Sequence, residues 1–207
     1  MKKIVFLILF LILILLITSF AHKPIFDDEL HNTFETALEI KSPQVSQITY
    51  HEFSETEAVF WIKFKAVKDE PVKIILTTPY HEKYADFNLY MTIFSENGKA
   101  ALKERTGITT DLPFSFPDSY DHLTVNTKDY DNKFFHEPFS NTDSWFMLVD
   151  YVVPEESGWI YIALNPTEEF QNFGKVGLSV GVLERFLPLD FFMLGSWIEG
   201  IRQFHEE

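Results

Sequence analysis

Three short apolar segments between residues 145 and 183 constrain the fold most strongly. Residues 145–153 and 159–164 are apolar runs rich in β-branched and aromatic side chains, and a Pro-Glu-Glu-Ser-Gly turn separates them. Both are too short for typical helices, so we expect buried strands. Residues 176–182 alternate apolar with small or polar side chains, which indicates a strand with one buried face. This stretch predicts a core built from β-sheet.

The same alternation recurs earlier in the chain. Residues 57–67 place apolar side chains at every second position, residues 72–76 repeat the pattern, and the turn sequence Asp69-Glu70-Pro71 lies between them. This arrangement predicts a hairpin. Residues 87–93 form a further alternating segment. We therefore expect an all-β, antiparallel, jelly-roll-like sandwich of about seven to nine strands over residues 22–185.

The N-terminus has the pattern of an export signal. Lys2 and Lys3 precede an apolar run over residues 4–17, and small residues stand at Ser19 and Ala21. The run is shorter than the ~20 residues that span a bilayer, so residues 1–21 are interpreted as a signal peptide cut after Ala21. Without cleavage they would form an N-terminal membrane anchor with its start in the cytoplasm. Either way the domain is predicted to be extracellular, periplasmic or on the outer face of the cytoplasmic membrane.

Composition narrows the classes of partner. The formal net charge of −14 argues against nucleic acid and against anionic lipid headgroups, because both repel an acidic surface. The chain has no cysteine, so an exported domain would be stabilised by its apolar core without disulfides.

Residues 100–144 differ from the alternating segments and are predicted to be an irregular insertion. They contain three prolines, many Asp and Asn residues and scattered aromatics. Long irregular segments in compact domains are often functional. The alternative is a structural insertion whose aromatic side chains pack on the sandwich. Calcium, which prefers oxygen ligands, would be a candidate cofactor. Its ligands would be Asp118, Asp121, Asp129 and Asp131.

Copper is the other candidate cofactor. Cleavage after Ala21 would leave His22 at the N-terminus, where its amine and ring nitrogen could chelate Cu(II). A second histidine would complete the site, and His136 is the candidate taken here, although spacing does not distinguish it from the others. Asp150, alone in an apolar run, is interpreted as a structurally paired carboxylate.

Residues 186–207 are predicted to hold an amphipathic helix, with Pro188 in its first turn. Its apolar side chains occupy more than one face, so one sheet would not cover them all. We expect the remainder to contact a second copy, a partner protein or lipid. The candidate partner-binding residues are Phe191, Leu194, Trp197, Ile198, Ile201 and Phe204.

Several short motifs resemble the bacterial pre-peptidase C-terminal domain, a β-sandwich appended to secreted enzymes. They are Thr36-Ala37, residues 59–66 and 71–77, Asp86-Phe87-Asn88-Leu89-Tyr90, Asn97-Gly98, Ser157-Gly158-Trp159-Ile160-Tyr161-Ile162 and Gly174-Lys175-Val176-Gly177-Leu178, where Val176 and Gly177 depart from the pattern. The resemblance implies a sandwich that acts as a binding or secretion module.

No nucleophile elbow, zinc-protease motif or phosphate loop is present in the sequence. The predicted function is therefore an exported, non-catalytic binding or structural module of the cell envelope, which would act as a subunit of a membrane-associated assembly. A copper-binding protein that uses His22 is the alternative, and a hydrolase ranks third.

Overall fold

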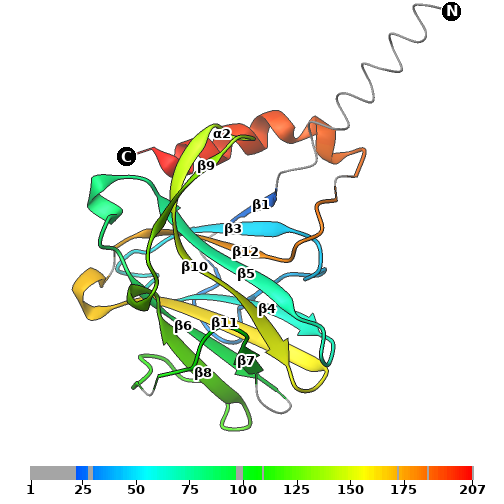
Figure 1. Cartoon of the computed structure of the whole chain (residues 1–207), viewed down its shortest axis with the longest axis vertical. Coiled ribbons are helices and arrows are strands. Elements are labelled where there is room, and N and C mark those ends of the chain that lie inside the picture. Colours follow the sequence, from blue (N-terminus) through cyan, green and yellow to red (C-terminus); the bar gives the residue numbers. More distant parts are fainter. Residues whose placement is uncertain are drawn as a thin grey trace, which may run out of the picture.

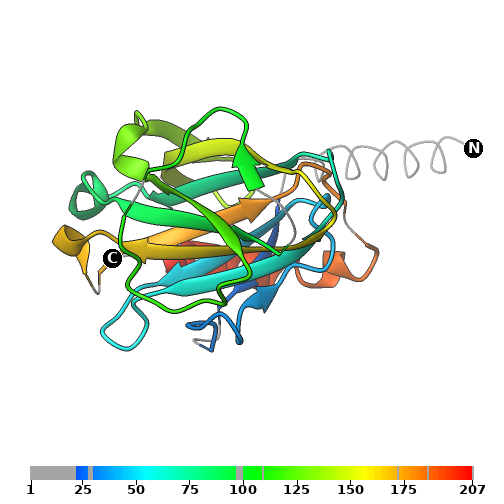
Figure 2. The same cartoon turned by 90° about the horizontal axis from the view of Figure 1, so that it is seen from below.

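The computed structural model describes residues 22–27, 30–96, 100–108, 110–171, 173–185 and 187–206. The predicted leader, residues 1–21, lies outside the described residues. The rest is mainly β: a seven-stranded sheet packs on a five-stranded sheet, and one C-terminal helix lies on the outer side of the larger sheet (Figure 1). Figure 2, seen from below, looks onto the five-stranded sheet. None of the described helices is long and apolar enough to cross a bilayer.

The seven-stranded sheet curls into a half-barrel and has the order β1-β3-β12-β5-β10-β7, with β9 also pairing with β10. Strand β10 is long enough to pair with β9 along its first half and with β7 along its second half. A bulge at Met147 interrupts its register with β5 and helps the sheet to bend. The strands are β1 (Lys23–Phe26), β3 (Gln47–Glu52), β5 (Val72–Pro79), β7 (Ala100–Leu102), β9 (Lys133–Glu137), β10 (Thr142–Pro154) and β12 (Lys175–Val180).

The five-stranded sheet has the order β2-β4-β11-β6-β8. Its strands are β2 (Leu38–Glu39), β4 (Phe60–Ala66), β6 (Leu89–Ser95), β8 (Asp121–Asn126) and β11 (Gly158–Pro166). Both sheets are mixed, because β1 pairs with β3 in parallel and β2 pairs with β4 in parallel. The prediction of a purely antiparallel sandwich is wrong at these two edges, where chain segments outside the alternating runs add short strands.

The core between the sheets follows the predicted alternation. Phe60, Ile62 and Phe64 of β4 face Val72, Ile74 and Leu76 of β5, and all six are at most 1% exposed. The predicted hairpin between these segments is wrong, however, because β4 and β5 belong to different sheets. The turn at residues 67–71 crosses from one layer to the other, and the Asp69 backbone N–H bonds the Pro154 carbonyl at 3.0 Å.

The predicted insertion is partly regular, since β7, β8 and β9 all lie within residues 100–144. The aromatic residues of this segment pack against both sheets, as expected. Phe114 and Phe116 pack on the outer face of the five-stranded sheet around Trp61 and Phe94, while Phe135 stacks on Phe146 with ring centroids 4.8 Å apart.

The C-terminal helix α2 (Leu194–His205) begins later than the predicted Pro188, after a 3₁₀ turn over Asp190–Phe192. Ile201 and Phe204 of α2 pack on Ile48 and Tyr50 of β3. The ammonium group of Lys175 donates to the Phe204 and Glu206 carbonyls at 3.0 Å each, which satisfies carbonyls at the helix end. The helix is therefore fixed onto the outer face of the half-barrel.

Candidate functional site

A pocket of about 300 Å³ lies on the outer face of the seven-stranded sheet, where the end of α2 covers it. Strand alternation explains its lining, because residues that flank the buried core positions of β5 point outwards. Lys73, Ile75 and Thr77 therefore line the pocket, while Ile74 and Leu76 fill the core. Curling of the β9–β10 hairpin brings Phe135 and Phe146 to the same cavity.

The imidazole of His205 enters the pocket from the last turn of α2. Its Nδ1–H donates to the Ile201 carbonyl at 2.8 Å, so Nε2 carries the lone pair and accepts from the Ser144 hydroxyl at 3.0 Å. Burial lowers the pKa of His205 below its ordinary value, which keeps the ring neutral at physiological pH.

In this contact the His205 imidazole is a weak base that lies beside the Ser144 hydroxyl group. A strong serine nucleophile needs a neighbouring base that becomes an imidazolium, and an acidic partner usually stabilises that charge. Here a main-chain carbonyl holds Nδ1, and burial further disfavours the charged ring. The geometry therefore places a neutral imidazole acceptor beside a hydroxyl group.

His22 lies in the same pocket, next to β1. Its Nδ1 contacts the hydroxyl groups of Ser46 and Ser179, the latter at 3.2 Å. Burial, together with the smaller effect of the nearby Lys73 charge, lowers the pKa of His22 from 6.5 to about 4. The ring is therefore neutral at physiological pH and available as a hydrogen-bonding group.

Two carboxyl groups complete the polar lining. Burial raises the pKa values of Glu137 and Glu184, while the Glu137 carboxylate accepts from the Phe139 backbone N–H at 3.1 Å. The pocket thus combines apolar walls, hydroxyl groups and two neutral imidazoles with one ammonium group and two carboxyl groups.

The lowered pKa of His22 predicts a loss of stability in acid. Between pH 6.5 and about 4 the unfolded chain binds a proton at His22 that the native state excludes, so the free energy of unfolding falls as pH falls through this window. We expect His22 to contribute about 2–3 kcal/mol of this fall. Denaturant unfolding at pH 7 and pH 4.5 measures it.

The control for this prediction is His22→Asn, which removes the titrating group and keeps a polar side chain. Glu137 and Glu184, with raised pKa values, contribute in the opposite direction, and His205 contributes in the same direction as His22. Because these three groups remain in both proteins, the difference between the two pH dependences isolates His22. Equal dependences in the two proteins would contradict the prediction.

The other candidate copper ligand, His136, lies away from this pocket lining. It is exposed on β9, and its Nδ1 contacts the Asp143 carboxylate at 2.7 Å. Within the described ranges, neither His22 nor His136 belongs to a group of three side chains placed to hold a metal ion. Copper binding at His22 stays a prediction, because it also depends on where the leader is cut.

The four candidate calcium ligands are exposed and lie at two places. Asp118 and Asp121 are at the start of β8, whereas Asp129 and Asp131 follow its end. Since a strand rises ~3.3 Å per residue, the length of β8 separates the two pairs by more than one ion can bridge. The structure does not gather these carboxylates around a common point.

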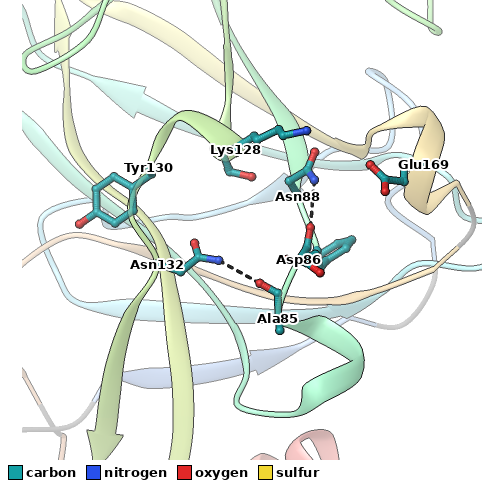
Figure 3. A pocket seen from close by; sticks show the side chains of 9 residues that line it. Ala85, Asp86, Asn88, Lys128, Tyr130, Asn132 and Glu169 are labelled. Carbon is teal, nitrogen blue, oxygen red and sulfur yellow. Dashed lines mark hydrogen bonds between the residues drawn. The ribbon is translucent and has the colours of Figure 1, made fainter.

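A second pocket, of about 280 Å³, lies where the start of β6 meets the segment after β8 (Figure 3). The amides of Asn88 and Asn132, which line it, are engaged with the backbone. The Asn88 amide donates to the Asp86 carbonyl at 3.0 Å, and the Asn132 amide donates to the Ala85 carbonyl at 3.4 Å. This pocket has fewer apolar walls than the one under α2, and we give it no role.

The candidate partner-binding residues divide between two environments. Trp197 and Ile201 are buried against the protein's own sheet and β1, whereas Phe191, Leu194, Ile198 and Phe204 are half-buried. More exposed apolar side chains precede α2, where Leu189 is 74% and Phe192 is 86% exposed. The most exposed apolar side chains of this region therefore lie before α2 and not on the helix itself.

Sequence reasoning identified His22 but missed Ser144, His205 and Lys73. The alternation of β5 could have indicated Lys73, because Lys73, Ile75 and Thr77 occupy the positions that point away from the core. The position of His205 depends on how α2 crosses the sheet, which no local pattern specifies. Comparison with models of known protein families and with curated proteins finds no match for this chain.

Proposed function

We propose that this domain is an exported, non-catalytic binding module that holds a small organic molecule in the pocket under α2. The observation that carries the proposal is the pocket itself, whose volume of about 300 Å³ lies at the lower end of typical ligand sites. Its composition, apolar walls with a few convergent polar groups, is also typical of such sites.

The lining indicates the chemistry of the ligand. His22 and His205 are neutral, and hydroxyl groups of Ser144 and Ser179 lie beside them, so uncharged hydroxyl, amide or carbonyl groups would be recognised. The stacked rings of Phe135 and Phe146 would contact an apolar part. We propose a small amphipathic molecule with hydrogen-bonding groups on one side.

A place in a membrane-associated assembly is part of the same proposal. It is supported by the apolar run at residues 4–17 and by the position of β1, which follows it directly in the chain. Lys23 of β1 forms an ion pair at 2.9 Å with Asp190, next to the exposed Leu189. A retained leader would therefore bring these exposed apolar side chains close to the membrane surface.

Val182→Trp tests the binding proposal. Val182 lines the pocket at 49% exposure, so the larger indole should block the cavity while leaving the core intact. We expect ligand-observed NMR with a library of small alcohols, amides and ketones to find binders of the unaltered protein. Those binders should lose at least ~10-fold in affinity for Val182→Trp, since a filled pocket excludes the ligand.

The matched control is Leu183→Trp, the same substitution at the next position. Leu183 is 59% exposed and does not line the pocket, so the affinities should remain unchanged. If no member of the library binds, or if both variants bind equally well, the pocket under α2 is not a ligand site.

A further inference from the structure

Three side chains outside the pocket form a second polar cluster. Asp27 follows β1, His51 lies in β3, and Glu57 lies between β3 and β4. One ligand atom from each residue lies within 4.8 Å of the other two, and among the described residues this is the group that could hold a metal ion. The side chains of Asp27 and His51 are only 3% and 1% exposed, and Glu57 is 5% exposed.

Hydrogen bonding sets the proton position on His51. Its Nδ1 lies 2.5 Å from the Asp27 Oδ2, and because an ionised carboxylate only accepts, Nδ1 carries a hydrogen. In the neutral form of the ring the lone pair is on Nε2, which is buried and has no hydrogen-bond partner among the described residues. Such buried, unpartnered nitrogens are costly and rare unless a ligand satisfies them.

Aromatic packing holds this ring rigidly. The His51 imidazole stacks on Phe60 at 4.5 Å with an interplanar angle of 7°, and it meets Phe53 edge-on at 4.7 Å. These contacts fix the direction of both ring nitrogens. A fixed imidazole is what a metal site requires, because the ligand geometry is then set before the ion binds.

A second histidine lies at the edge of the cluster. His31 Nδ1 donates to the Thr36 carbonyl at 2.6 Å, so in the neutral ring Nε2 carries the lone pair. This Nε2 lies 4.0 Å from the Asp27 Oδ1, a buried oxygen without a hydrogen-bond partner in the described part of the chain. A backbone carbonyl that orients a ring in this way is typical of histidines that bind metals.

The charge of the cluster also points to a cation. The ion pairs of Asp27 among the described residues are with His31 and His51, which carry a positive charge only when protonated. The buried Asp27 carboxylate therefore has no permanently charged cation as an ion-pair partner in the described part of the chain, and burying a carboxylate in this way is unfavourable. A divalent cation would supply that charge at neutral pH.

We propose that Asp27, His51 and Glu57 bind a divalent transition-metal ion of the zinc type, with His31 beside them. An imidazole with carboxylates suits zinc, whereas calcium and magnesium prefer oxygen ligands alone. The ion would join the end of β1 to β3 and to the β3–β4 connection. It would stabilise this edge of the fold, independently of the ligand pocket.

Isothermal titration of chelator-treated protein with ZnCl₂ tests the proposal. We expect one zinc ion per chain, and an affinity reduced by about 100-fold or more in the nearly isosteric variants Asp27→Asn and Glu57→Gln, as expected for loss of a direct ligand. CaCl₂ should not bind at this site. The matched control is Asp143→Asn, which alters the exposed His136–Asp143 pair, a similar His–carboxylate contact at 2.7 Å.

A second readout distinguishes metal binding from misfolding. Zinc should raise the melting temperature of the unaltered protein and of Asp143→Asn, but not that of either cluster variant, each of which should still unfold cooperatively. Cobalt should give a visible absorption band that only the cluster variants lack. Failure of the unaltered protein to bind zinc, or binding that persists in both cluster variants, would overturn the proposal.

Discussion

Replacing Trp61 with alanine is expected to lower the free energy of unfolding by about 3–5 kcal/mol, the usual cost of removing a large buried aromatic side chain. Trp61 is on the outer face of the five-stranded sheet, yet it is 0% exposed. Its ring stacks on Phe94 at 5.3 Å and meets Phe114 edge-on at 4.9 Å. The side chain therefore joins the sheet to the segment that covers it.

Two measurements check this prediction. Denaturant unfolding should give the loss of stability, and hydrogen exchange should increase at residues 112–120, because these residues depend on Trp61 for packing. The control is Trp159→Ala on β11, where the ring is only half-buried and its neighbours are the lysines Lys63 and Lys65. The free energy of unfolding of this control should fall by only ~1 kcal/mol. Equal losses for Trp61→Ala and Trp159→Ala would contradict the role of Trp61 in joining the two layers.

Replacing Asp150 with alanine is expected to cost a similar ~3–5 kcal/mol, because it breaks a buried charge network. Asp150 is 1% exposed and lies opposite Ile74 on the inner face of β10. Its Oδ1 accepts from the backbone N–H groups of Glu104 at 3.0 Å and Tyr151 at 2.7 Å. Its Oδ2 lies 3.9 Å from Arg105 Nε. These contacts confirm the prediction of structural pairing.

Asp150→Asn separates hydrogen bonding from charge. The amide oxygen can still accept from both backbone N–H groups, so we expect a smaller loss of about 1–2 kcal/mol, caused by the missing charge beside Arg105. Asp143→Ala, at an exposed position on the same strand, should change stability by less than ~0.5 kcal/mol. A loss for Asp150→Ala no larger than this control would show that the network is unimportant.

Local patterns in the sequence were enough to locate most of the long strands. The runs at residues 145–153, 159–164 and 176–182 correspond to β10, β11 and β12, because alternation and short apolar length directly reflect which side chains a strand buries. The C-terminal helix was found for the same reason, although its start was placed too early. The prediction that Asp150 is structurally paired was also correct, since a buried carboxylate requires partners wherever it lies.

Strand pairing could be known only from the three-dimensional fold. Alternation in β4 and β5 is the same whether the two form a hairpin or face each other across the core, and here they face each other. Among the described strands, β9 and β10 are the consecutive pair that hydrogen-bonds within one sheet, and each of the other connections between consecutive strands crosses from one sheet to the other. Pairing between distant segments leaves no local signal, so the sequence could not reveal it.

The candidate sites also depend on contacts between segments that are distant in the sequence. His205 and Ser144 are 61 positions apart in sequence, and they meet because α2 crosses the outer face of the half-barrel. Asp27 and His51 meet because β1 pairs with β3 in parallel, which places the residue after β1 beside the end of β3. The pattern of residues along the chain was enough to predict which side chains the strands bury, because burial is encoded residue by residue. The structure decided which polar side chains converge, because convergence depends on the order of strands in each sheet.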